Sequence, residues 1–151
     1  MNSYDTLIIG TGCAALKCAD ELCHMGRKSL AILTDDERAG TSRNAGSDKQ
    51  TYYKLTLSGF DGDSVGEMAR TLFSGGCVDG THALCEAALS APCFLRLCEL
   101  GVPFPTNRYG EYIGYKTDHD PRRRATSAGP LTSKMMAEAL DKSVRAAGVP
   151  I

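Results

Sequence analysis

The stretch DTLIIGTGCAALK, residues 5–17, decides the fold of this chain. The apolar run at residues 6–9 predicts a buried β-strand that leads directly into Gly10 and Gly12. The apolar positions after Gly12 repeat at helical spacing, and Gly26 ends this segment as a left-handed residue beyond a helix would. A second β-rich run follows at residues 29–34. Together these segments predict one βαβ unit.

The glycines of this unit form the pattern G-x-G-x-x-A. Gly10 permits a tight turn, Gly12 lets a ligand approach the backbone, and Ala15 lets the helix lie close to the sheet. Free N–H groups in the first helical turn favour an anion. Asp35 follows near the spacing of about 20 residues expected for a ribose-binding acid. We therefore expect a dinucleotide-binding unit, and the alternative is an ordinary tight βα turn without a nucleotide.

The composition limits the classes of function. The chain has 151 residues, of which 42% are hydrophobic, enough for one domain with a real core. Its formal net charge of -1 predicts no bulk attraction to nucleic acid or to an anionic membrane. No apolar run reaches the roughly 18 residues of a membrane span, and no targeting segment is recognised. We expect a cytoplasmic protein.

The cysteines do not form a recognisable framework. Their count is odd and no C-x-x-C pair occurs, which argues against a disulfide scaffold and against a metal site, so we expect no bound metal. Most fall at apolar helix positions, which predicts buried and reduced thiols. Cys13 is the exception, because a helix N-terminus can lower the pKa of a thiol. The seven are Cys13, Cys18, Cys23, Cys77, Cys85, Cys93 and Cys98.

A small, polar, glycine-bearing segment follows the second strand at residues 40–50. We expect it to form a loop across the carboxyl edge of the sheet, where open α/β sheets bind their ligands. Its hydroxyls, amides and backbone N–H groups suit a ribose, a pyrophosphate or the polar edge of a ring. The alternative is a solvated connection.

Helices dominate the rest of the chain. Three are expected next, with N-caps supplied by Ser64, Asp79 and Ser90. Pro92 falls in the first turn of the third. Residues 107–113 predict an irregular hairpin. A final helix runs from Leu131 to Val144, with Thr132 or Ser133 as its cap and Gly148 as its stop.

The most charged stretch is residues 116–124. A run of mixed sign is typical of a solvated loop. The alternative places an arginine beside an anionic substrate or a phosphate, since the guanidinium fork matches such groups. His119 and Arg124 are the candidates for a substrate-facing catalytic role, although neither is a convincing general acid.

Residues 149–151 predict the start of another strand. A sheet strand that is cut here would leave the preceding helix unbacked. We therefore expect residues 1–151 to be the N-terminal part of one domain in a longer protein, with the remaining segments outside this chain.

The chain resembles the flavoprotein subunits of the succinate dehydrogenase and fumarate reductase family over essentially its whole length. The resemblance rests on the turn at residues 10–15, the loop at 40–48 and the segment APCFLRLCELGVPF at 91–104. A matching Arg-x-Gly-x-Tyr at 108–112 follows, and then Arg124 with Thr126 and Gly129 before a long helix. The resemblance implies an incomplete, Rossmann-like α/β FAD-binding domain with inserted helices, whose cap region lies outside this chain.

The resemblance also implies an FAD site. The pyrophosphate would lie on Gly10, Gly12, Cys13, Ala14 and Ala15, and the adenosine ribose near Thr34 and Asp35. The phosphates and the isoalloxazine ring would be lined by Thr41, Ser42, Arg43, Asn44, Gly46 and Ser47. Relatives with covalent flavin carry a histidine in this loop, and here the loop reads Ser42-Arg43-Asn44. Non-covalent FAD is therefore expected.

The function implied is hydride transfer between FAD and a carboxylate-type substrate such as fumarate, with an electron-transfer partner that the residues do not identify. The catalytic residues of the family lie beyond Ile151. One alternative is a truncated, non-catalytic nucleotide-binding fragment. Another is a nicotinamide dehydrogenase in which Asp35 bonds the ribose 2′-OH, but the long polar loop and the run of helices after the second strand favour FAD.

Overall fold

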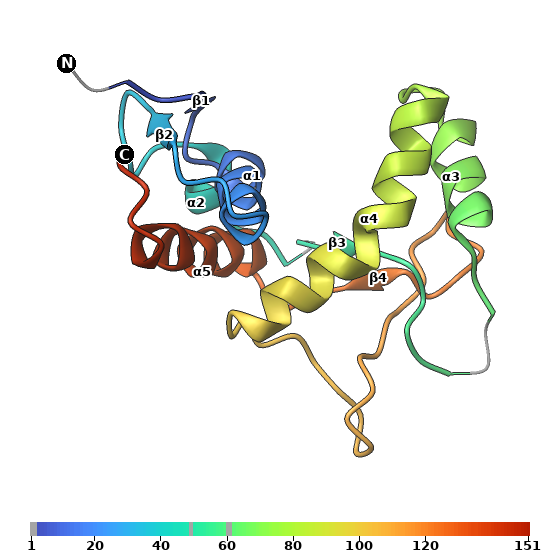
Figure 1. Ribbon diagram of the computed structural model, residues 1–151. Coiled ribbons are helices and arrows are strands. Elements are labelled where there is room, and N and C mark those ends of the chain that lie inside the picture. The colour runs from blue at the N-terminus through green and yellow to red at the C-terminus, as the bar shows by residue number, and fades with distance from the viewer. Residues whose placement is uncertain (1–2, 49, 60–61) are drawn as a thin grey trace. The chain divides into compact units, whose positions relative to one another are not determined.

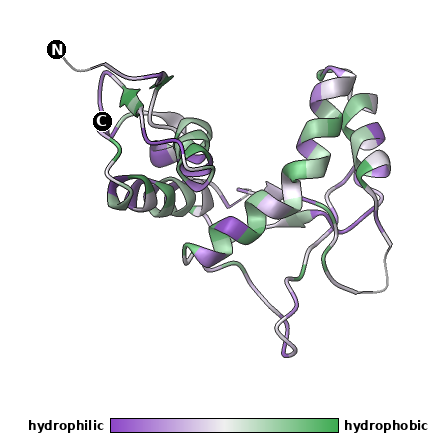
Figure 2. Ribbon diagram, in the orientation of Figure 1, coloured by the Kyte–Doolittle hydropathy of each residue, from purple (hydrophilic) through white to green (hydrophobic). Residues whose placement is uncertain are grey.

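A parallel strand pair opens the chain. In the computed structural model, which describes residues 3–48, 50–59 and 62–151, β1 (Thr6–Ile9) pairs with β2 (Leu30–Leu33) in the register Thr6–Leu30 to Ile9–Leu33. The crossover between them is α1 (Cys13–His24). Both strands are strongly hydrophobic (Figure 2), and Ile8, Leu30, Ala31 and Ile32 are buried. The predicted βαβ unit is confirmed.

The chain divides into two compact units, which we describe separately (Figure 1). The first unit comprises Met1–Gln50, Leu100–Val102 and Gly129–Ile151, and the second comprises Thr51–Glu99 and Pro103–Ala128. The strand pair and its crossover belong to the first unit.

In the first unit α1 packs against α5 (Thr132–Ala146). Leu16 and Ala19 of α1 are fully buried, as are Ala137 and Val144 of α5. These positions follow the helical period, so the apolar stripe of each helix covers that of the other.

Glycines end both helices as predicted. Gly26 has φ +77°, its N–H donates to Cys23 O, and the N–H of Arg27 donates to Leu22 O. This bonding satisfies the carbonyls left free at the end of α1. Gly148 has φ +78° and follows α5 in the same way.

The beginning of α5 differs from the prediction. Its N-cap residue is Leu131 and no side chain of the helix caps it, because the Thr132 hydroxyl donates to Gly129 O instead. The side chain of Gln50 supplies the missing acceptor, since Gln50 Oε1 receives the N–H of Ser133 at 2.9 Å. The predicted cap by Thr132 or Ser133 is therefore wrong: the partner of the helix N-terminus comes from a distant loop.

The strand expected at residues 149–151 is also not formed. Pro150 O accepts the N–H of Ile32 at 2.9 Å, so this segment lies beside β2. Pro150 has no N–H to return a bond, and a single bond does not make a ladder.

The second unit contains a helix pair and a two-residue antiparallel ladder. α3 (Val65–Ser74) packs on α4 (Gly80–Glu99), and β3 (Tyr52–Tyr53) pairs with β4 (Ala125–Thr126). Ser64 caps α3, because its hydroxyl accepts the N–H of Glu67 at 3.1 Å. Asp79 accepts two N–H groups at the start of α4. Both predicted caps are confirmed.

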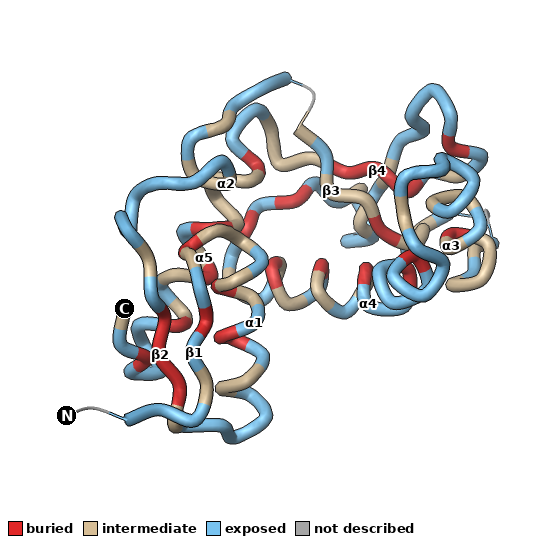
Figure 3. Tube along the Cα trace, turned by 90° about the horizontal axis from the view of Figure 1, so that it is seen from above, coloured by how far each residue is buried: buried red, intermediate tan, exposed pale blue. Residues whose placement is uncertain are grey.

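One helix replaces two predicted ones. α4 runs through Ser90 and Pro92, and the Ser90 hydroxyl donates to Ala87 O at 2.9 Å rather than capping a new helix. Buried residues continue along one side of α4 on both sides of the proline (Figure 3), at Ala83, Ala87, Ser90, Phe94 and Leu97. Packing of this stripe offsets the bond that Pro92 cannot make, and the exposed ring leaves the core undisturbed.

The predicted irregular hairpin is present. Thr106 and Tyr112 form an antiparallel bridge, and Asn107 N donates to Glu111 O at 2.9 Å. The Tyr112 ring packs edge-on against Phe94, with ring centroids 5.0 Å apart. This aromatic contact anchors the hairpin to α4.

The thiols are more exposed than predicted. Cys18, Cys77 and Cys85 are exposed, and the other four cysteines are partly exposed. All seven are free, and none is buried in the described chain. Cys18 and Cys85 lie outside the buried stripes of α1 and α4, and Cys77 lies in the segment between α3 and α4, so their apolar character does not place these thiols in the core. Among the described residues no helix is long and apolar enough to span a membrane, and no group of three metal-ligating side chains is found.

Candidate cofactor-binding site

A cavity of about 370 Å³ lies in the first unit at the carboxyl ends of β1 and β2. Ligands bind at this edge of parallel α/β sheets. Four residues that the sequence predicted for a nucleotide line the cavity: Gly10, Gly12, Thr34 and Asp35. The other lining residues are Ile9, Thr11, Leu33, Asp36, Ala39 and Gly40.

Gly10 forms the turn between β1 and the cavity. Its φ of +97° lies in the region that favours glycine, and its N–H donates to Leu33 O at 2.7 Å. The hydroxyl of buried Thr11 lies 3.4 Å from that of Thr34, which itself donates to Asp36 O at 3.2 Å. The turn after β1 is thereby tied to the loop after β2, which fixes the shape of the cavity wall.

The N-terminus of α1 provides hydrogen-bond donors. The first bond within the helix runs from Leu16 N to Gly12 O. In the described part of the chain, the N–H groups of Ala14 and Ala15 have no protein acceptor. The N–H of Cys13 does have one, the Ser42 hydroxyl at 3.2 Å. Two donors at the positive end of a helix can therefore receive an anion.

The polar loop contains one turn of helix, α2 (Thr41–Asn44). Ser42 is its closest link to the glycine turn, because a Cβ on Gly12 would lie 3.4 Å from Ser42 Oγ. Thr41, Gly46 and Ser47 are exposed and do not line the cavity. The N–H of Ser47 donates to Pro130 O at 3.0 Å, which holds the end of the loop.

Two predicted cofactor contacts are engaged with protein groups. Arg43 Nη2 lies 3.4 Å from Asp141 Oδ1, and Arg43 Nε is buried without an acceptor in the described chain. Asn44 Nδ2 donates to Arg38 O and Gly40 O, each at 3.0 Å. In this structure these two side chains hold the loop together.

Cys13 does not have a lowered pKa. Burial raises the pKa of the thiol, and the Ser42 hydroxyl and the Arg43 charge oppose that effect only in part. The expected lowering is therefore wrong, because loss of solvent around the sulfur outweighs the effects that lower the pKa. The Sγ atom lies 3.5 Å from Ser133 O.

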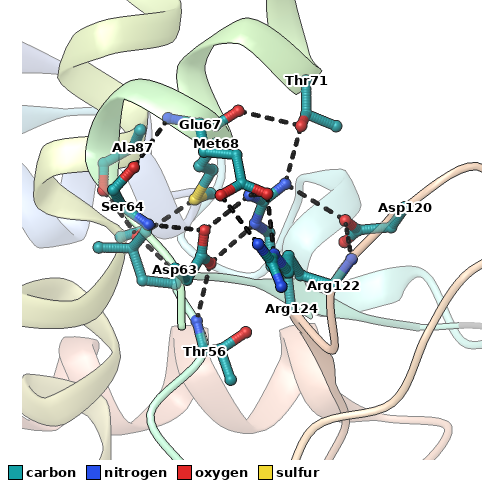
Figure 4. Close-up of polar contacts among 12 residues, drawn as sticks. Thr56, Asp63, Ser64, Glu67, Met68, Thr71, Ala87, Asp120, Arg122 and Arg124 are labelled. Carbon is teal, nitrogen blue, oxygen red and sulfur yellow. Dashed lines mark hydrogen bonds and ion pairs between the residues drawn. The ribbon is translucent and has the colours of Figure 1, made fainter. Parts of the chain in front are cut away.

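Arg124, a predicted catalytic candidate, is fully buried in the second unit (Figure 4). Its Nε and Nη2 donate to the two oxygens of Asp63 at 2.9 and 2.7 Å. Its Nη1 donates to Thr71 at 2.9 Å and to Asp120 at 3.2 Å. This guanidinium joins separate segments of the second unit, and its substrate-facing role stays a prediction.

The charges around Arg124 shift each other's pKa values. Burial raises the pKa of Asp63, but hydrogen bonds from Arg124 and from two backbone N–H groups outweigh it and leave the pKa below its usual range. The bond to Asp63 raises the pKa of Arg124 above its already high value. His119, the other catalytic candidate, is exposed.

A larger groove of about 630 Å³ lies in the second unit. It is mainly apolar, and its lining residues come from β3 and from within α3 and α4 rather than from their first turns. The lining residues are Tyr52, Tyr53, Met68, Leu72, Cys85, Glu86, Leu89, Ser90 and Cys93. The cavity of the first unit, which follows the glycine turn and includes Asp35 and Asp36 in its lining, is therefore the better candidate for a nucleotide despite its smaller volume.

The model of one protein family, described as the FAD binding domain, matches residues 5–150. The chain belongs to the FAD-binding domain family. FAD is accordingly its cofactor, and the residues present fit a dinucleotide: a glycine turn and an acid line the cavity, and the helix that follows the turn begins with two N–H groups that have no protein acceptor in the described chain. No curated protein sequence matches the chain.

Solved structures share the fold of this FAD-binding domain. A mutant of E. coli quinol fumarate reductase FrdA superposes with a TM-score of 0.79 at 16% identity, covering 99% of this chain and 25% of that one. Mycobacterium smegmatis Sdh1 superposes with a TM-score of 0.73 at 19% identity, covering 93% of this chain and 23% of that one. A 3-ketosteroid-Δ4-(5α)-dehydrogenase from Rhodococcus jostii RHA1 superposes with a TM-score of 0.71 at 15% identity, covering 98% of this chain and 37% of that one. The chain thus spans between 23% and 37% of the length of these proteins.

The predicted family and fold class are confirmed, and so is the cofactor. Six lining residues were not among the predicted contacts, although each lies within two positions of one that was: Ile9, Thr11, Leu33, Asp36, Ala39 and Gly40. The sequence also missed the contact of Gln50 with Ser133. The two residues are 83 positions apart, and nothing in a single sequence marks such a pair.

Proposed function

We propose that this chain binds FAD non-covalently in the cavity of the first unit, as part of a flavin-dependent oxidoreductase. The observation that carries the proposal is a cavity lined by Gly10 and Gly12 directly before α1, in whose first turn the N–H groups of Ala14 and Ala15 have no protein acceptor in the described chain. The pyrophosphate binds these two N–H groups, which the helix dipole reinforces. Thr34 and Asp35 also line the cavity, and they hold the adenosine ribose.

The loop at residues 40–48 encloses the rest of the cofactor in this proposal. Thr41, Gly46 and Ser47 are exposed and accessible to a ligand. The side chains of Ser42, Arg43 and Asn44 contact protein groups, and these contacts fix the conformation of the loop. No histidine occurs in this loop, which supports non-covalent binding.

FAD, when bound, supplies hydride chemistry, and the protein supplies orientation and hydrogen bonds. We infer a carboxylate-type substrate and an electron-transfer partner from the resemblance to the succinate dehydrogenase and fumarate reductase family. The names of the structural relatives include a fumarate reductase and a ketosteroid dehydrogenase, so the shared fold serves more than one substrate class. His119 and Arg124 remain candidates for contact with substrate. The expected cytoplasmic location stays a prediction.

The test is titration of the purified chain with FAD, followed by flavin fluorescence and visible absorbance. We expect a yellow complex whose flavin is released by acid. The Gly12→Val variant, with a branched side chain beside Ser42, should lose binding. Gly66→Ala, in α3 of the second unit, is the matched control and should bind as the parent does.

Three results would contradict the proposal. A folded chain that binds no FAD removes the cofactor assignment to these residues. Preferential binding of a nicotinamide dinucleotide would favour the dehydrogenase alternative. Flavin that stays with the protein after acid would exclude non-covalent attachment.

A further inference from the structure

Gln50 joins the polar loop to the N-terminus of α5. It lies at the end of the polar loop, and its side chain makes three hydrogen bonds within the first unit. Oε1 accepts the backbone N–H of Ser133 at 2.9 Å and the Ser133 hydroxyl at 3.1 Å. Nε2 donates to Ala45 O at 3.2 Å. Both ends of the amide are therefore in use.

Ser133 extends this connection to the glycine turn. Its carbonyl oxygen lies 3.5 Å from Cys13 Sγ, and Cys13 is the first residue of α1. The polar loop and the N-terminus of α1 are thus bridged through one turn of α5, in the order Ala45, Gln50, Ser133, Cys13. We call these four residues the α5 bridge.

Other contacts hold the same loop against α5. Ser47 N donates to Pro130 O at 3.0 Å, and a Cβ on Gly46 would lie 3.2 Å from Leu131. Gln50 differs from these neighbours because its amide reaches both the loop backbone and the helix N-terminus. Its partly buried position shields these bonds from competing water.

We propose that Gln50 is a positioning residue for FAD: through the α5 bridge it sets the loop of residues 41–48 against the N-terminus of α1. This inference rests on the proposed FAD site. Gln50 does not line the cavity, so it acts through the backbone it holds. A loop ordered before binding spares the cofactor the entropic cost of ordering it, and affinity rises accordingly.

The test compares Gln50→Leu, Gln50→Glu and Ser133→Ala in the whole chain. Leucine at this position removes all three hydrogen bonds of the Gln50 side chain. Glu keeps the acceptor for Ser133 but cannot donate to Ala45 O. Ser133→Ala removes one hydroxyl and leaves the backbone bond. Glu138→Gln, an exposed change on the same helix, is the control.

Two readouts are needed. Amide hydrogen exchange without FAD reports whether the Ser133 N–H is protected. We expect protection in the parent and in Gln50→Glu, and its loss in Gln50→Leu. The FAD dissociation constant, measured well below the melting temperature, should rise about tenfold in Gln50→Leu and less in the other two variants. The control should bind as the parent does.

The outcomes separate this inference from the proposed function. If the parent binds FAD and the folded Gln50 variants bind equally well, the positioning role is wrong and the FAD site stands. If the parent binds no FAD, both fail. If Gln50→Leu does not fold, Gln50→Glu and Ser133→Ala decide, and unchanged affinity in both overturns the inference.

Discussion

Asp63 and Arg124 form a bidentate ion pair that is almost completely buried, although 61 positions separate them. The paired N–O distances are 2.9 and 2.7 Å, and the exposed fractions of the side chains are 2% and 0%. Thr56 N and Ser64 N also donate to Asp63. This pair connects the segment before α3 to the residue directly before β4, so it joins two distant segments of the second unit.

Removal of the Asp63 charge should destabilise the chain strongly. Asp63→Asn leaves the buried guanidinium without its main counter-charge, which typically costs about 3–5 kcal/mol when one partner of a buried pair is lost. Urea denaturation measures the change in the free energy of unfolding. Glu138→Gln breaks only an exposed contact with Lys134 and should change stability by less than about 1 kcal/mol. Equal effects of the two substitutions would contradict the buried geometry.

The contribution of Asp63 should depend on pH in a definite direction. The pKa of this carboxyl is lower in the folded chain than its usual value of about 3.9. Its stabilisation is therefore complete above that value and is lost as the pH falls through the lower, folded pKa. The difference in unfolding free energy between the parent and Asp63→Asn should stay constant from about pH 5 to 7 and shrink below about pH 4. A difference that grows on acidification would show the opposite shift.

Pro92 offers a test of the continuous α4 helix. Proline in a helix interior costs about 3 kcal/mol relative to alanine, because it removes a bond and crowds the preceding turn. Pro92 is exposed, so Pro92→Ala should restore the bond without leaving a cavity. We expect stabilisation of about 1–3 kcal/mol in thermal or urea unfolding. A helix that restarted at Ser90 would tolerate proline in its first turn, and then the substitution would have no such effect.

The Cys13 thiol should react slowly with alkylating reagents. Burial raises its pKa, and only the thiolate attacks an alkylating reagent. Mass spectrometry after short treatment of the folded chain with iodoacetamide should find the exposed Cys18, Cys77 and Cys85 modified before Cys13. Denaturation before treatment should remove the difference. Early modification of Cys13 in the folded chain would show that the helix N-terminus dominates its pKa after all.

The local pattern of residues 5–35 was enough to predict the βαβ unit and the cavity at its edge. Each element there depends on neighbours in sequence: an apolar strand, glycines at turn positions, and a helical period. The caps at Ser64 and Asp79 are equally local and were predicted correctly. The same reasoning failed at Ser90, where packing of Phe94 and Leu97 in a continuous stripe carries α4 through a proline.

The sequence by itself determined the glycine turn, the helix that follows it and the dinucleotide character of the chain, because these depend on backbone freedom and short-range spacing. Only the tertiary structure decided the partners of Gln50, Arg43 and Arg124, which are Ser133, Asp141 and Asp63. Such pairs form when folding brings distant segments together and leaves a buried polar group that must find a partner. Their identity depends on three-dimensional proximity, which a single sequence does not encode locally.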